Sequence, residues 1–168
     1  KIRRSSAGKY SQNKTGLIFV RAVVQRVKSA SVTVDGEVIA STGNGLLILA
    51  GFHSSDTHED SDYIISKCIN LRIFEDTAGL MNLSVADLRG EILVVSQFTL
   101  YGDARKGRRP SFSDSMPPAK AEQFYNEFLQ KFKDSYSPVQ SGRFQADMDI
   151  ALVNSGPVTI LLDSKKQF

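Results

Sequence analysis

The chain has 168 residues, a formal net charge of +3 and one cysteine. A length of this order predicts one domain with its own core, and a single cysteine excludes an intrachain disulfide. Cys and His pairs at metal-ligand spacing are absent, and the longest apolar runs are far shorter than the roughly 20 residues that cross a bilayer. The sequence therefore predicts neither a zinc site nor a membrane span.

The positive charge is concentrated at the N-terminal end. Residues 1–19 hold five Lys or Arg and no acidic residue, so residues 20–168 carry a net charge of −2. The body is therefore not the uniformly basic domain that many nucleic-acid-binding proteins show. We expect residues 1–19 to be an N-terminal extension, whether a tail, a targeting remnant or read-through sequence, and residues 20–168 to form the domain. The expected location is the cytoplasm, or an organelle if the extension is a targeting remnant.

The first half of the domain is predicted to begin with β structure. Alternating apolar residues around Asp35-Gly36 predict two or three strands with a two-residue hairpin turn at that pair. Residues 45–52 predict a strand buried on both faces. Asp56 with Glu59 three residues later resembles a capping box and predicts the start of a helix.

The second half contains the strongest helix signal. Residues 71–85 predict a short strand, a turn and a further extended piece, and residues 91–100 predict a long strand buried on both faces. Pro118 fits the first position of a helix. The apolar residues that follow recur at helical spacing and predict a core-facing stripe: Ala121, Phe124, Tyr125, Phe128, Leu129 and Phe132.

The last part of the chain predicts two strands, at residues 139–146 and 148–163, with Gly156-Pro157 interrupting the second. Glycine weakens a strand and proline cannot donate to its ladder, so this pair needs another reason. The element order, ββ(β)β–α–ββ–α–ββ(β), lacks the strict alternation of a doubly wound sheet. We therefore predict a single α/β domain that is β-rich and α+β-like, with two main helices.

A serine or cysteine hydrolase is not favoured by the pattern. His53 and His58 lie in a polar stretch that we expect to be an exposed connection, away from any serine that they could activate. Ser96 lacks the GxSxG elbow, and Cys68 falls on the apolar face of a predicted helix. Such a hydrolase acting on small esters stays open as a third hypothesis.

Acidic pairs and phosphate-binding motifs add little. The pairs Glu75/Asp76 and Asp147/Asp149 fit turns or strand edges, so we interpret them as solvated surface charge. Neither a P-loop nor a dinucleotide-binding fingerprint is present.

The stretch SQFTLYGDARKGRR gives the clearest functional signal. A buried strand is predicted to end in Gln97, Phe98 and Thr99, where an aromatic ring could stack on a base and an amide could bond its edge. A glycine-containing loop then presents four cations suited to tRNA phosphates. An ordinary core strand followed by a solvated loop fits the spacing equally well, so both interpretations stay open. The four cations are Arg105, Lys106, Arg108 and Arg109.

Over residues 20–163 the sequence resembles the D-aminoacyl-tRNA deacylase family. The stretches RAVVQRVKSASVTVDGEV, KCINLRIFED, VVSQFTLYGDARKGRRPSF and VNSGPVT occur in the family's order and at similar separations. The resemblance implies mixed or antiparallel sheets in a barrel-like arrangement, and a homodimer with its active sites at the subunit interface. It implies hydrolysis of the ester of D-aminoacyl-tRNA to a free D-amino acid and tRNA, a chiral proofreading step in translation, without a metal or cofactor. Glycyl-tRNA is a predicted second substrate, and the alternative is a non-catalytic tRNA- or RNA-binding domain.

The resemblance also assigns roles to the two strand-end motifs. The first motif would line the pocket for the terminal adenosine, and the second would place a cis Gly-Pro peptide in the partner's pocket, with backbone atoms facing the α-carbon of the substrate. A fixed main-chain wall can reject L-aminoacyl groups whatever their side chain. An X-Pro bond is the peptide for which cis costs least. The residues so assigned are Ser96, Gln97, Phe98, Thr99, Gly156 and Pro157.

Further residues complete the expected site. Arg26 resembles the arginine that braces the Gly-Pro peptide, Asn154 belongs to the second motif and is assigned to substrate binding, and Phe144 and Met148 resemble a pocket wall. Gln145 stands where the family typically has Gly. Either Thr99 or an oriented water could be the nucleophile, with main-chain N–H groups near Phe98 and Thr99 as the oxyanion hole, and the sequence leaves both open.

Overall fold

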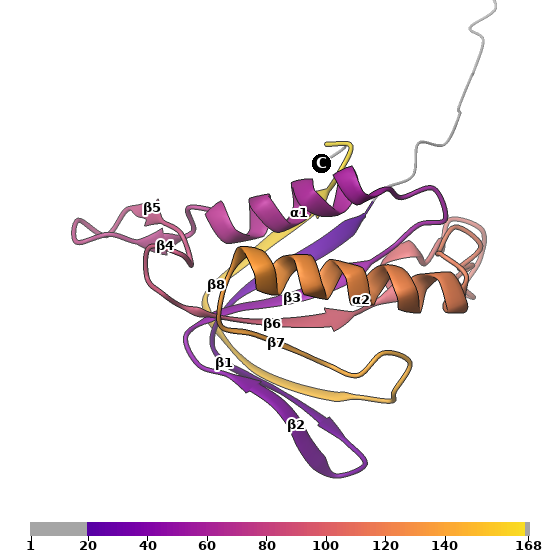
Figure 1. Cartoon of the computed structure of the whole chain (residues 1–168), viewed down its shortest axis with the longest axis horizontal. Helices are drawn as coiled ribbons and strands as arrows, with labels where there is room; N and C mark the ends of the chain where they lie inside the picture. Colours follow the sequence, from indigo (N-terminus) through magenta and orange to yellow (C-terminus); the bar gives the residue numbers. More distant parts are fainter. Residues whose placement is uncertain (1–19, 167–168) are drawn as a thin grey trace, which may run out of the picture.

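The computed structural model describes residues 20–166, so the prediction of a separate extension at residues 1–19 lies outside the described residues. One curved sheet carries two helices on the same side (Figure 1). In chain order the elements are β1 (Arg21–Val34), β2 (Glu37–Thr42), β3 (Gly45–Gly51), α1 (His58–Asn70), β4 (Phe74–Glu75), β5 (Met81–Leu83), β6 (Glu91–Ser96), η1 (Phe98–Tyr101), α2 (Pro118–Ser135), β7 (Val139–Ser141) and β8 (Asp149–Asp163).

The sheet curls around its longest strand, β1. Residues 21–27 of β1 pair with β3 and residues 30–34 pair with β2, while β8 runs antiparallel to β1 along most of its length. β3 pairs in parallel with β6, and β6 pairs in parallel with β7. The sheet is therefore mixed and barrel-like, and the predicted β-rich α/β fold class is confirmed.

Two apolar clusters bury both faces of β3 and β6. The larger cluster lies between the sheet and the two helices, and all six residues of the predicted α2 stripe are buried in it. Cys68 is fully buried there, as predicted. The smaller cluster fills the opposite face, where Met148 and Ile150 pack against Val95 and its neighbours. This second contact holds the segment after β7 beside the end of β6.

The helix α1 begins one residue later than the capping pattern predicts. Its N-cap is Thr57, whose side chain and backbone pair with Asp60 in a capping box. Asp56 instead accepts the backbone N–H of His53 through its carboxylate at 2.6 Å, and it is buried. The predicted cap at Asp56 and Glu59 is therefore wrong, because the Asp56 carboxylate bonds the backbone of His53 instead of the first turn of the helix.

Three predicted strands differ in extent. The strand predicted at residues 91–100 ends at Ser96, and η1 follows. The strand predicted at residues 139–146 is only three residues long, because the chain leaves the sheet in a loop where Gln145 adopts a left-handed φ of 59°. β8 in contrast continues past Gly156-Pro157, and a shift in its register against β1 accommodates the pair as a bulge.

The predicted hairpin turn is confirmed. Asp35 and Gly36 have φ of 52° and 80°, the positive values that a two-residue turn of this kind requires. Across residues 20–166, no helix is long and apolar enough to cross a membrane.

Candidate active site

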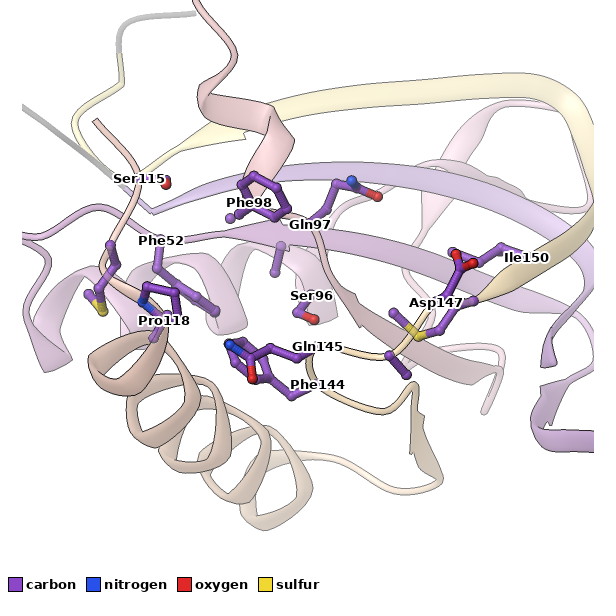
Figure 2. Close-up of a pocket in the computed structure, with 16 residues that line it drawn as sticks. Phe52, Ser96, Gln97, Phe98, Ser115, Pro118, Phe144, Gln145, Asp147 and Ile150 are labelled. Carbon is purple, nitrogen blue, oxygen red and sulfur yellow. The ribbon is translucent and has the colours of Figure 1, made fainter. Parts of the chain in front are cut away.

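A cavity of about 690 Å³ opens where the parallel strands β3 and β6 end (Figure 2). The carboxyl ends of neighbouring parallel strands are a common place for ligand sites, because loops diverge there. Segments far apart in the sequence form its walls: the end of β3, the end of β6, the start of α2 and the loop before β8. Five predicted site residues line it, namely Ser96, Gln97, Phe98, Phe144 and Met148.

Phe98 is the most exposed aromatic side chain of this cavity. The residue is 57% exposed, and its ring packs edge-on against Phe112, with 5.2 Å between the ring centroids. This contact fixes the ring while leaving the rest of its surface open. A planar base could therefore stack on it.

Gln97 and Thr99 bond to each other. The Gln97 backbone N–H donates to the carbonyl of Ala50 at 2.7 Å, which ties the β6 end to β3. Its side-chain Nε2 donates to the Thr99 hydroxyl at 2.5 Å. Thr99 is exposed and lies outside the residues that line the cavity. Because a neutral amide takes up no proton, this contact orients the hydroxyl without activating it as a nucleophile.

The opposite wall is built around Phe144. Its ring packs against Tyr125 of α2, with 5.7 Å between the centroids, and so anchors the loop to the core. Gln145, next in the chain, also lines the cavity. Figure 2 shows its side chain extending along the wall beside Phe144, on the side of Pro118.

Several lining residues were not found from the sequence. The segment before α2 is drawn to the cavity because the Met116 N–H donates to the Phe52 carbonyl at 2.8 Å and Ser115 bridges to His53. The segment after β3 and the end of β6 meet because β3 pairs with β6. No local sequence pattern predicts that these two strands are neighbours. Asp147, interpreted as surface charge, also lines the cavity. The lining residues missed include Phe52, Ser115, Met116, Pro118, Ala121 and Asp147.

His53 is not the exposed residue that the sequence predicts. It is 4% exposed, its ring packs near Tyr101, and its Nδ1 accepts the Ser55 N–H at 3.0 Å. Burial lowers the pKa of the His53 imidazole below its ordinary value, which outweighs the opposing effect of Asp114. The prediction was wrong because the chain folds back over this residue through contacts that no local pattern encodes.

The Gly156–Pro157 peptide lies away from the cavity of its own chain. The peptide bond is cis, as the resemblance implies, and both residues are exposed, as is Asn154. Residues 155–158 bulge out of the pairing between β8 and β1, opposite Arg26. The structure thus presents this peptide on the outside of the chain.

The side chain of Arg26 binds the backbone of this bulge. The side chain is buried, and its guanidinium donates to the Ser155 carbonyl at 2.9 Å and to the Ile73 carbonyl at 2.5 Å. Gly156 has φ of 122°, and a Cβ added there would lie 2.7 Å from Arg26 Nη2. Glycine is therefore required twice, for its backbone conformation and for the close approach of the guanidinium.

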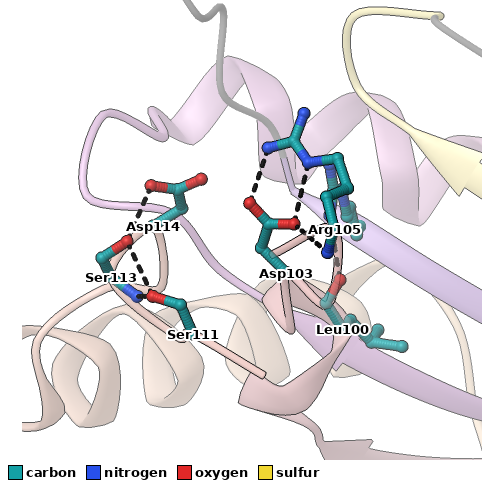
Figure 3. Close-up of polar contacts among 7 residues, drawn as sticks. Leu100, Asp103, Arg105, Ser111, Ser113 and Asp114 are labelled. Atoms are coloured by element: carbon teal, nitrogen blue, oxygen red, sulfur yellow. Dashed lines mark hydrogen bonds and ion pairs between the residues drawn. The ribbon is translucent and has the colours of Figure 1, made fainter. Parts of the chain in front are cut away.

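The basic loop after η1 is exposed, but its cations are not equivalent. Arg105 donates two side-chain hydrogen bonds to the Asp103 carboxylate, at 2.8 and 2.7 Å (Figure 3). This pair holds the pKa of Asp103 well below its usual range. Within residues 20–166, Lys106, Arg108 and Arg109 form no such ion pair, and all three are exposed.

Comparison with known proteins identifies the family. The sequence profile of D-Tyr-tRNA(Tyr) deacylase matches residues 23–163. The D-aminoacyl-tRNA deacylases of Thermosipho melanesiensis and Clostridium botulinum are 54% identical over 150 residues and 55% identical over 149 residues. Both matches cover 89% of this chain and 100% of the relative.

Solved structures share the fold. A protein described as c-Myc DNA Unwinding Element Binding Protein has a TM-score of 0.81 and 46% identity, covering 84% of this chain and 97% of that one. A probable eukaryotic D-amino acid tRNA deacylase has a TM-score of 0.76 at 18% identity, covering 87% and 100%, and supports the fold alone. On the sequence profile and the curated relatives, the chain belongs to the D-aminoacyl-tRNA deacylase family.

Proposed function

We propose that this chain hydrolyses the ester of D-aminoacyl-tRNA in the cavity at the ends of β3 and β6, releasing the D-amino acid and tRNA. The observation that carries the proposal is the cavity itself, which has the family's SQFT motif at its rim in a chain of that family. Its volume of about 690 Å³ suits a nucleoside with an attached aminoacyl group, since small-molecule sites span roughly 300–1,000 Å³.

The terminal adenosine would occupy the space between the two aromatic residues. Phe98 offers an exposed ring face on one wall, and Phe144 lies on the other. Stacking of this kind is worth about 1–3 kcal/mol per base and does not depend on base identity. All tRNAs end in the same nucleoside, so recognition here would serve every aminoacyl-tRNA.

The chirality filter requires a second copy of the chain. β8 pairs only with β1 among the described residues, and Leu152, Val153 and Leu161 of this strand are exposed. A long strand with an open edge and exposed apolar side chains favours a covering partner. In a two-fold homodimer each copy would insert its Gly156-Pro157 bulge into the other's cavity, giving two equal sites. The exposed position of this bulge, outside its own cavity, supports that arrangement.

A rigid bulge can select one mirror image. The Arg26 guanidinium donates to the Ser155 carbonyl, directly before Gly156, and its second hydrogen bond, to the Ile73 carbonyl, fixes the guanidinium itself. L- and D-aminoacyl esters carry the same groups, so discrimination must come from position, and a fixed backbone wall blocks one side-chain direction. Glycine has no side chain to block, which is why we expect glycyl-tRNA to be hydrolysed as well.

We favour water over Thr99 as the nucleophile. Among residues 20–166, the one hydrogen-bond partner of the Thr99 hydroxyl is the Gln97 amide, which is not a base. Phe98 and Thr99 open η1, where main-chain N–H groups have no partner within the helix, so these groups are available to a developing oxyanion. The reaction adds water to the ester carbonyl and expels the ribose oxygen, and the substrate's own 2′-OH lies next to it.

The basic loop would bind the phosphates of the acceptor end. Lys106, Arg108 and Arg109 are the stronger candidates, since the charge of Arg105 is largely neutralised by its ion pair. A location in the cytoplasm, where aminoacyl-tRNA is used, fits this function.

One assay tests the proposal. D-tyrosyl-tRNA and L-tyrosyl-tRNA are incubated with the protein in separate reactions, and the remaining ester is followed with time. Fast loss of the D-ester with the L-ester left intact supports the proposal. Salt-sensitive tRNA binding without hydrolysis of either ester would instead support the non-catalytic nucleic-acid-binding alternative. Inactivation by a reagent that modifies serine or cysteine would support the third hypothesis, a serine or cysteine hydrolase that acts on small esters. Equal hydrolysis of both esters would contradict the chirality filter.

A further inference from the structure

The two glutamines that line the cavity are in different states. The Nε2 of Gln97 already donates a hydrogen bond to the Thr99 hydroxyl, so it has fewer free N–H groups for a ligand. The side chain of Gln145 is exposed, and within residues 20–166 its amide has no hydrogen-bond partner. The cavity therefore has one free amide on its wall, with a donor and an acceptor both available.

The backbone at Gln145 makes this side chain unexpected. Its φ of 59° lies in the left-handed region, which costs an L-residue roughly 1–2 kcal/mol and which glycine enters freely. The side chain belongs to neither apolar cluster. The strained backbone of Gln145 is not offset by packing or by hydrogen bonds of its side chain within the described chain. This indicates that the side chain acts on a ligand.

We propose that Gln145 hydrogen-bonds the edge of the terminal adenine, so that this chain reads the base and does not only stack on it. The inference rests on the proposed function of the cavity and adds a specificity residue to it. A glutamine amide matches adenine, because its carbonyl accepts from the 6-amino group while its NH₂ donates to a ring nitrogen. Guanine presents acceptors at the corresponding edge and would leave the Gln145 carbonyl unpaired.

The position of Gln145 suits this role. It follows Phe144, whose ring is anchored on Tyr125, and the adjoining Ala146 and Met148 pack against the second cluster. Both flanks of Gln145 are thus fixed, while its side chain extends along the cavity wall (Figure 2). An adenine seated between the two walls would present its edge to that side chain.

The test pairs a change in the enzyme with a change in the base. D-tyrosyl-tRNA is prepared with a 3′-terminal adenosine and with a 3′-terminal purine riboside, which lacks the 6-amino group. Initial rates give KM and kcat for the wild-type chain and for Gln145→Gly and Gln145→Ala. Gln145→Gly suits the left-handed backbone, so we expect it to fold, and Gln145→Ala keeps a Cβ while removing the amide.

We expect the wild type to show a KM roughly 5- to 100-fold higher for the purine-riboside substrate, in keeping with the discrimination of a paired base contact, and a similar kcat. Both variants should show a raised KM for the normal substrate and little further change when the 6-amino group is removed. The inference is overturned if removing the 6-amino group leaves the KM of the wild type unchanged. It is also overturned if that removal raises the KM equally in the wild type and in the variants. Failure to hydrolyse any D-tyrosyl-tRNA would overturn the proposed function itself, so the two failures are distinguishable.

Discussion

The brace between Arg26 and the Gly156 bulge gives the sharpest test of the chirality filter. Arg26→Lys keeps the positive charge, but one ammonium group cannot span the carbonyls of Ser155 and Ile73 as the planar guanidinium does. A hydrogen bond from a charged donor contributes about 1.5–3 kcal/mol, so loss of one should lower the free energy of unfolding by about that amount. The ion pair of Arg26 with Glu75 adds little, because it is 4.0 Å long and Glu75 is exposed.

If the same free energy holds the bulge in place during the reaction, the preference for D- over L-tyrosyl-tRNA should fall by about 10- to 150-fold in Arg26→Lys. Hydrolysis of both esters and urea unfolding should be measured on the same preparations. Gly156→Ala should act in the same direction, since its Cβ would lie 2.7 Å from Arg26 Nη2.

Tyr136→Phe is the matched control for lost stability. The Tyr136 hydroxyl bonds the carbonyls of Val85 and Gly90, at 3.1 and 2.6 Å, and lies outside the cavity lining. Its removal should cost about 1–3 kcal/mol of stability and leave the D-over-L preference unchanged. A destabilised Arg26→Lys variant with wild-type discrimination would refute the reasoning and make Arg26 a purely structural residue.

Two further predictions concern charge. Replacing Lys106, Arg108 and Arg109 together by neutral residues should make the negative slope of log affinity for tRNA against log salt less steep by about 2–3. Neutralising Arg105 alone should change the slope less, because its charge is already paired. An unchanged slope in the triple variant would mean that the loop does not touch phosphate. Burial raises the pKa of Asp56 to about 7, so its contribution to stability is present below about pH 4 and is lost as the pH rises through 7. Asp56→Asn should therefore be more stable than the wild type at pH 8, by up to about 4 kcal/mol, and nearly equal to it near pH 4; urea unfolding at the two pH values measures this, and the same difference at both would contradict the buried-charge explanation.

The local sequence determined the elements whose signals are contained within a few neighbouring residues. The apolar stripe of α2 predicts its buried face because side chains three and four apart share one side of a helix. Asp35-Gly36 predicts its turn because few residue pairs accept two positive φ angles. The motif SQFT likewise marks one wall of the cavity, and the resemblance carried by it and by VNSGPVT indicates the family.

Only the tertiary structure decided which distant segments share a site. Arg26 and Ser155 are 129 residues apart, and their contact depends on the register of β1 against β8. The parallel pairing of β3 with β6 brings Phe52 and Ser96 to the same cavity, and the same fold buries His53, which a polar sequence context predicts to be exposed. Local patterns report which face of an element is apolar, but they do not encode which elements meet, because that choice minimises the free energy of the whole chain.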